Sequence, residues 1–218
     1  MGFNGAMPAH DDHPGPLREQ LRRRWPLSGD DALREDLLDA WDRPGYHDLQ
    51  HLADVLGRLA ELAEAGVDYP HLPVVLAAWF HDAVYDGERD AEERSAAWAE
   101  DTLPLSVGEE TATEVARLVR MTETHEPAED DLAGCALSDA DLAILAAPPA
   151  RYSAYVRSVR EEYSHLDDDS FALGRTQVLE HLAEKPTLFH TAPARSAWEA
   201  DARANLDAEL AGLRRVAS

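Results

Sequence analysis

The sequence predicts an all-α protein, built as a bundle of about nine or ten helices. Apolar residues recur at the 3.6-residue spacing of a helix along the chain, and no alternating apolar and polar run bounded by turn residues occurs. The 218 residues, of which 44% are hydrophobic, suit one domain with a single core. We therefore expect a flexible lead-in at residues 1–15 and one helical domain over residues 16–218.

Individual helices follow from this periodicity and from end signals. Ser106 with Glu109, and Asp90 with Glu93, have the spacing of a capping box, which predicts a helix start at each pair. Gly66 suits the left-handed residue that ends a helix. We expect helices at about 16–26, 30–42, 47–65, 73–85, 91–103, 107–122, 135–146, 149–164, 170–185 and 194–215.

The charge balance excludes several partners. Twenty Lys and Arg against 43 Asp and Glu give a formal net charge of −23, which repels the backbone of duplex nucleic acid and anionic membranes. The longest apolar stretch, residues 72–80, is far shorter than the roughly 20 residues of a membrane span. A single cysteine, Cys135, forms no intramolecular disulfide, and we expect a cytoplasmic protein. Any phosphate site must then be made locally positive by a metal or by arginines.

The segment PVVLAAWFHDAVYD, residues 73–86, is the most informative in the chain. Its apolar residues cover every side of a helix, so we expect it to be buried together with His81 and Asp82. A buried carboxylate costs several kcal/mol unless it is paired or ligates a metal. A hydrogen-bonded His-Asp pair is the structural alternative.

Two further segments place histidine and aspartate side chains on or beside the apolar faces of predicted helices. In GYHDLQHL, residues 45–52, His47 and His51 are one helical turn apart beside a leucine-rich stripe, although such pairs are often bystanders. In LSDADLAILAA, residues 137–147, Asp141 lies in the middle of the apolar stripe, whereas Asp139 points almost the opposite way and can be solvated. An inward Asp141 needs a cation, and His and Asp ligands suit divalent transition metals.

The order H…HD…D across a helical chain resembles the HD-domain superfamily of metal-dependent phosphohydrolases. The phrases YHDLQHL, WFHDAVYD, EERSA, SDADLAIL and GRTQVLEHL together resemble a family of stand-alone bacterial proteins of this superfamily, over roughly residues 41–210. The resemblance implies an HD-type helical bundle and a divalent metal, with Mn, Zn, Fe, Co, Ni and Mg not distinguished. It implies that the metal ligands are His51, His81, Asp82 and Asp141.

The same resemblance suggests a role for His47 and leaves the number of metals open. His47 stands where the similar YHN motif of cyclic-nucleotide phosphodiesterases carries a proton donor to the leaving group; a capping or supporting histidine is the alternative. No histidine follows His81 at the spacing of dinuclear relatives, and no GYP signature is present. His125, at a helix end, is a candidate further ligand or phosphate contact, although a histidine that complements the helix dipole is favoured.

Four residues are candidates for binding the substrate besides His125. Arg160 and Arg175 lie among apolar residues, where arginine suits bidentate phosphate binding but equally a buried salt bridge, which is favoured for each singly. Tyr85 and Asp86 follow the His-Asp pair and are expected to line the pocket.

We therefore expect a metal-dependent hydrolase that cleaves a phosphate ester of a small molecule, such as a nucleotide or a related metabolite. Water activated by the metal attacks phosphorus, His47 protonates the leaving oxygen, and Asp82 holds the metal and orients the water. The alternatives are a di-iron oxygenase of the HD type and a non-catalytic metal-binding regulatory domain. The expected partner is a small phosphorylated substrate, and the chain is a monomer or a homodimer.

Overall fold

The computed structural model describes residues 15–87 and 89–216, and within them it contains eleven α-helices, one 3₁₀ helix and no β-strand. The prediction of an all-α bundle is confirmed. The expected lead-in at residues 1–15 lies almost wholly outside the described residues. The elements are α1 (Pro16–Arg22), α2 (Asp31–Trp41), α3 (Leu49–Glu64), α4 (His71–Phe80), α5 (Ala91–Thr102), α6 (Pro104–Val107), α7 (Glu109–Met121), α8 (Leu132–Leu142), η1 (Ala143–Ala146), α9 (Pro149–Glu162), α10 (Asp168–Glu184) and α11 (Ala192–Val216).

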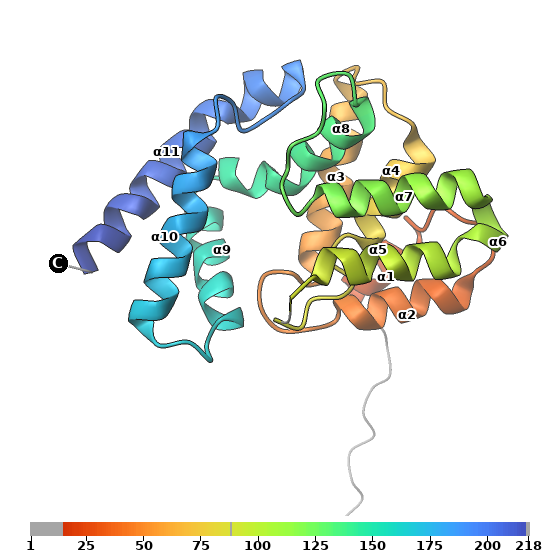
Figure 1. Cartoon of the computed structure of the whole chain (residues 1–218), viewed down its shortest axis with the longest axis horizontal. Helices are drawn as coiled ribbons and strands as arrows, with labels where there is room; N and C mark the ends of the chain where they lie inside the picture. Colours follow the sequence, from red (N-terminus) through yellow and green to blue (C-terminus); the bar gives the residue numbers. More distant parts are fainter. Residues whose placement is uncertain (1–14, 88, 217–218) are drawn as a thin grey trace, which may run out of the picture.

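The helices form two groups that meet at the end of α8. In the larger group α4 packs against α3, α7 and α8, and α5 packs against α7. In the smaller group α9, α10 and α11 lie together, on the left of Figure 1. The 3₁₀ helix η1 joins the two groups because it continues α8 and packs against both α9 and α11.

Helix α4 is the central element of the core. Every residue from Val74 to Phe80 is buried, as its apolar character on all sides predicts. Burying a large apolar side chain contributes about 1.5–3 kcal/mol. The buried Nε1 of Trp41 donates to the carbonyl oxygen of Trp79 at 2.9 Å, which ties α2 to the end of α4. The residue that follows α4 is His81, so this packing fixes its position.

Three helix boundaries near the candidate site differ from the predicted ones, and the end of α4 differs most. The helix predicted at 47–65 begins at Leu49, because the side chain of Asp48 accepts the N–H groups of Gln50 and His51 and so caps the helix. His47 therefore precedes the helix. The helix predicted at 73–85 ends at Phe80, which leaves Asp82 in a turn. The helix predicted at 135–146 begins at residue 132 and tightens to 3₁₀ geometry over residues 143–146.

The two predicted capping boxes do not form. Gly108, at φ 83°, separates the short α6 from α7, so Ser106 does not start the helix that contains Glu109. Asp90 does precede α5, but its side chain makes no capping hydrogen bond. Glu93 instead pairs with the guanidinium of Arg120, with N···O distances of 2.6 and 2.7 Å. Gly66 is left-handed at φ 89°, as predicted.

No single helix in residues 15–87 and 89–216 is long and apolar enough to cross a membrane. The segments 132–146 and 149–162 meet the length and composition criteria only when they are taken together, and they are bent by 104° relative to each other.

Candidate metal centre

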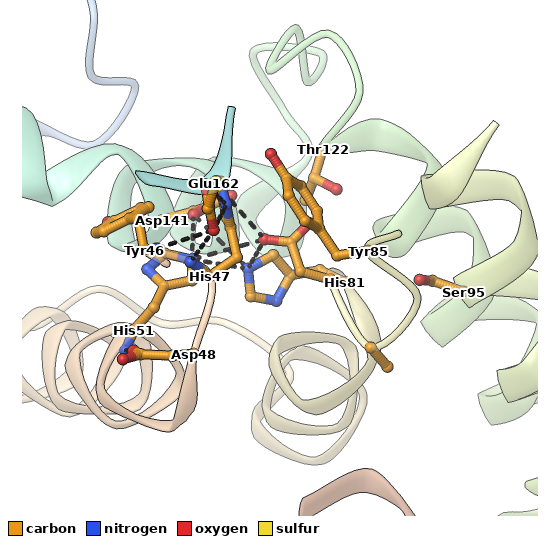
Figure 2. A network of polar contacts seen from close by, with 12 residues as sticks. Tyr46, His47, Asp48, His51, His81, Tyr85, Ser95, Thr122, Asp141 and Glu162 are labelled. Carbon is orange, nitrogen blue, oxygen red and sulfur yellow. Dashed lines mark hydrogen bonds and ion pairs between the residues drawn. The ribbon is translucent and has the colours of Figure 1, made fainter. Parts of the chain in front are cut away.

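Three of the predicted ligands converge at one point, although they come from distant parts of the chain (Figure 2). His51 lies in the first turn of α3, His81 directly follows α4, and Asp141 lies near the end of α8. The two Nε2 atoms of His51 and His81 are 3.3 Å apart. Oδ1 of Asp141 lies 3.2 Å from Nε2 of His51 and 3.6 Å from Nε2 of His81. Atoms of this kind and spacing are able to bind one divalent metal ion.

Asp82 adjoins this group. Its Oδ2 lies 3.3 Å from Nε2 of His81 and 3.7 Å from Nε2 of His51. We refer to His51, His81, Asp82 and Asp141 as the ligand cluster. The structure therefore brings together all four residues that the resemblance implies as ligands.

The hydrogen bond made by Nδ1 of His81 fits a metal ligand. Nδ1 of His81 lies 2.8 Å from the carbonyl oxygen of Ala78, which only accepts hydrogen bonds, so Nδ1 is the donor. In the neutral ring, Nε2 then carries a lone pair, and it is this atom that faces His51 and Asp141. A backbone carbonyl that fixes the tautomer is common behind histidines that bind metals.

The electrostatics of the cluster favour a cation. Burial opposes the charged form of His81, but Asp82 and Asp141 outweigh burial and raise its pKa to about 9. Burial also opposes the ionised form of Asp141, yet His81 and His51 hold its pKa well below the ordinary value. The buried carboxylate is therefore ionised and attracts positive charge, whether a proton on histidine or a metal ion.

His47 stands beside the cluster and not in it. Nδ1 of His47 lies 3.0 Å from both carboxylate oxygens of Glu162, at the end of α9. Nε2 lies 3.9 Å from Oδ2 of Asp82, and the ring stacks on Tyr85 with centroids 4.1 Å apart. Burial lowers the pKa of His47, but Asp82 and Glu162 outweigh it, and the pKa is raised overall.

His125 also faces the cluster. It has a left-handed backbone with φ 52°, directly after the turn that ends α7. Nδ1 lies 3.1 Å from Oγ of Ser138, and Nε2 lies 3.7 Å from Oδ2 of Asp141. Burial lowers the pKa of His125. The sequence favoured a role at the helix dipole for this residue, whereas in the structure it lies next to a candidate ligand.

A cavity of about 680 Å³ opens on one side of the cluster. His47, Asp82, His125 and Asp141 lie at its polar end, and helices α9 and α10 form the opposite wall. Its size lies within the range of sites for small molecules, which are about 300–1,000 Å³. The arrangement thus offers a metal position, a histidine able to carry a proton and space for a substrate.

Comparisons of the chain with protein-family models, curated proteins and solved structures found no match in any of the three. What the site does must therefore be inferred from its own geometry.

The residues expected to bind substrate divide between the cavity and the surface. Tyr85 and Arg175 line the cavity. Asp86 does not line it and binds Arg94, with N···O distances of 2.6 and 2.7 Å. Arg160 does not line it either, because its guanidinium is directed to Asp168 at 2.7 Å and to two backbone carbonyls. Asp86 and Arg160 therefore do not line this cavity, and their role in substrate binding stays a prediction.

Sequence reasoning missed Glu162, which organises the loop before α3. Besides His47 Nδ1, its Oε1 accepts the backbone N–H groups of Tyr46 and His47 at 2.8 and 2.7 Å. Gly45 permits this approach, since a Cβ there would lie 2.0 Å from Cγ of Glu162, and its φ of 113° also favours glycine. Gly45 is a weak signal that a side chain packs closely here, but nothing local identifies which one.

Arg43 was missed as well. Its guanidinium donates to the carbonyl oxygens of Ala40 at 2.9 Å, His47 at 2.5 Å and Ala83 at 3.3 Å, and also to that of Asp82. One side chain thus links the loop before α3 to the turn after α4. Burial lowers the pKa of Arg43.

Asp139 was expected to be solvated, and this expectation was wrong. Its side chain is fully buried on the side of α8 away from the cluster. Its two oxygens accept the backbone N–H groups of His190 at 2.6 Å and Thr191 at 2.8 Å. These groups immediately precede α11, so Asp139 satisfies donors at a helix start, where a carboxylate is also favoured by the helix dipole.

Proposed function

We propose that this chain is a metal-dependent phosphohydrolase of the HD-domain type, which uses a divalent ion at the ligand cluster to hydrolyse a phosphate ester. One observation carries the proposal: two buried imidazole Nε2 atoms and a mostly buried carboxylate converge within 3.6 Å, at the edge of a cavity that His47 also lines. Buried ionised groups that are directed at one another and at a cavity are typical of functional sites. The sequence resemblance to HD-domain proteins supports the same reading.

A divalent ion bound there supplies a Lewis acid that polarises a phosphoryl oxygen and activates water. Hydrogen bonds position two residues of the cluster. The ring of His81 is oriented by the carbonyl of Ala78, and the backbone of His51 is held by the cap that Asp48 gives to α3. Asp82, whose backbone carbonyl accepts a hydrogen bond from Arg43, would accept a hydrogen bond from the attacking water in this proposal.

His47 is placed to act as the general acid. Glu162 occupies Nδ1, which leaves Nε2 as the atom that faces Asp82 and the cavity. The P–O bond to the leaving group breaks while the water oxygen bonds to phosphorus, and the water releases one proton to solvent. The leaving oxygen takes the proton from Nε2 of His47, and His47 regains a proton from solvent.

The test measures metal content and hydrolysis together. We expect the purified full chain to contain about one transition-metal ion, to lose phosphatase activity to a chelator and to regain it when the metal is restored. His51→Ala and His81→Ala should both lose the metal. His71→Ala, at the exposed start of α4, is the matched control and should keep metal and activity. Hydrolysis at full rate by metal-free protein would overturn the proposal, and metal binding without hydrolysis of any phosphate ester would favour a regulatory domain.

One observation favours a second candidate, a di-iron oxygenase. Nε2 of His125 lies 3.7 Å from Oδ2 of Asp141, the oxygen that is not closest to the two cluster histidines. In this second candidate, His125 and Asp141 would contribute ligands to a second ion. Two iron atoms per chain, with loss of one of them in His125→Ala, would favour this reading over the phosphohydrolase.

A further inference from the structure

Helix α10 presents one continuous face to the cavity. The residues that line it, among them Phe171, Gly174, Val178 and Leu182, recur every three or four positions, which is the spacing of one side of a helix. This face is incompletely covered by protein: Val178 is 53% exposed, and among the described residues of α10 only Leu179 is fully buried. In Figure 1, α10 stands apart from the larger group of helices that carries the ligand cluster.

The cavity is therefore chemically divided. Its end at the ligand cluster is polar, with His47, Asp82 and His125. Its other walls come from the end of α8, from η1, α9 and α10, and from the loop between the last two. Apolar and aromatic side chains there stand beside four polar residues of α10, namely Ser170, Arg175, Gln177 and His181. The apolar and aromatic residues of these walls are Leu142, Ile144, Leu145, Tyr155, Val159, Tyr163, Leu166, Phe171, Val178 and Leu182.

The cavity has little positive charge of its own. Its lining includes four carboxylates, those of Asp82, Glu92, Glu123 and Asp141, and only one arginine or lysine among the described residues, Arg175. That guanidinium is already bound by Glu209, at 2.8 and 3.2 Å, and by the hydroxyl of Tyr155 at 3.0 Å. Beyond the metal position, a chain of phosphates would thus meet these carboxylates and the histidines His125 and His181, but no free guanidinium among the described residues.

Gly174 marks open space at the centre of the apolar wall. A Cβ added there meets no atom within 4 Å, and its φ is not in the left-handed region. Neither a close approach nor the backbone conformation therefore requires glycine. Glycine inside a helix costs about 1 kcal/mol relative to alanine. The cost at Gly174 is consistent with a wall that keeps room for a ligand.

From these observations we infer that the substrate carries a single phosphoryl group joined to a bulky apolar or aromatic moiety. The phosphoryl group lies at the ligand cluster, and the moiety packs along α9 and the face of α10 around Gly174. This inference rests on the proposed phosphohydrolase function, since the metal position defines which end of the cavity takes the phosphate.

The binding test uses two phosphonates that cannot be hydrolysed, 1-naphthylmethylphosphonate and methylphosphonate, with the metal-loaded full chain in a calorimeter. The naphthyl compound should bind at least about tenfold more tightly. Gly174→Phe should remove most of that advantage and leave methylphosphonate binding unchanged. Leu173→Phe, at a neighbouring position that is 63% exposed and does not line the cavity, is the matched control and should change neither affinity.

A second variant guards against misfolding of Gly174→Phe. Val178→Glu changes an exposed cavity residue, so the fold should tolerate it, and it should weaken naphthylmethylphosphonate selectively. Equal affinity of the wild-type chain for the two phosphonates would overturn the inference. So would equal weakening of both phosphonates in Val178→Glu.

Hydrolysis separates this inference from the proposed function. We expect kcat/KM to be higher for 1-naphthyl phosphate than for glycerol phosphate or for adenosine triphosphate. Equal values for naphthyl phosphate and glycerol phosphate, or a preference for the triphosphate, would overturn the substrate class while the phosphohydrolase stands. Hydrolysis of none of the three with any divalent metal would overturn both.

Discussion

Asp139 and Asp141 lie two residues apart on α8, and their carboxylates bind partners on opposite sides of the helix. Asp141 faces Nε2 of His51 at 3.2 Å, whereas Asp139 accepts the N–H groups of His190 and Thr191 in front of α11. A separation of two residues turns side chains by about 200° around a helix. Helix α8 therefore contributes Asp141 to the candidate metal site and uses Asp139 to bind the start of α11, in the second group of helices.

The first prediction separates the two aspartates. Asp141→Ala should lose the metal and hydrolysis, because it removes a ligand from the cluster. The folded Asp139→Ala variant should keep the metal. Its free energy of unfolding should be lower by about 1–3 kcal/mol, because the backbone N–H groups of His190 and Thr191 lose their acceptor. Metal content per folded chain and thermal unfolding measure the two effects. Loss of metal from folded Asp139→Ala would contradict the assignment.

The second prediction concerns His47 and Glu162. His47→Ala should retain the metal and lower turnover by about 10²–10⁴, the usual scale for a lost general acid. Glu162→Gln should also lower turnover, because Glu162 orients the ring through Nδ1. If Glu162 acts through His47, the Glu162→Gln change has little further effect in the His47→Ala background. Kinetics of the two single variants and the double variant, with metal content as control, test this; additive losses would show that the two residues act separately.

The third prediction concerns stability. A metal that binds only the folded chain stabilises it by about 2.7 kcal/mol at a concentration 100 times Kd. For a chain of this size, each kcal/mol raises Tm by about 2–4 °C. Chelation should therefore lower Tm by several degrees, and return of the metal should restore it. His51→Ala should show no such response, and an equal response in that variant would place the ion elsewhere.

The fourth prediction concerns Arg43. Arg43→Met should lower the free energy of unfolding and reduce turnover, because it removes the donor that serves four backbone carbonyls on both sides of the site. Arg157→Met, at an exposed position on α9, is the control and should be nearly neutral. Urea unfolding and hydrolysis rates of the two variants measure the effect. Full activity of Arg43→Met would show that the two loops do not need this link.

Local patterns in the sequence determined the fold class and the elements with strong periodicity. The apolar residues on all sides of α4 correctly predicted its burial. The helical wheel correctly placed Asp141 on the side of its helix that faces the buried His51. Such patterns report which side of a helix is buried, since burial follows the local sequence period. The resemblance that implied the four candidate ligands also rests on such local sequence motifs.

The tertiary structure decided what each buried group meets. The helical wheel placed Asp139 away from Asp141, but it could not show that the backbone of His190, 51 residues later in the chain and just before α11, lies there. The Glu162 carboxylate reaches His47 over 115 residues, and the loop around His47 exists because Asp48 starts α3 after it. Arg160 and Arg175 look alike in sequence, yet only Arg175 lines the cavity. The physical reason is that a periodic pattern is set by neighbours along the chain, whereas hydrogen bonds and ligand geometry depend on groups that only packing brings together.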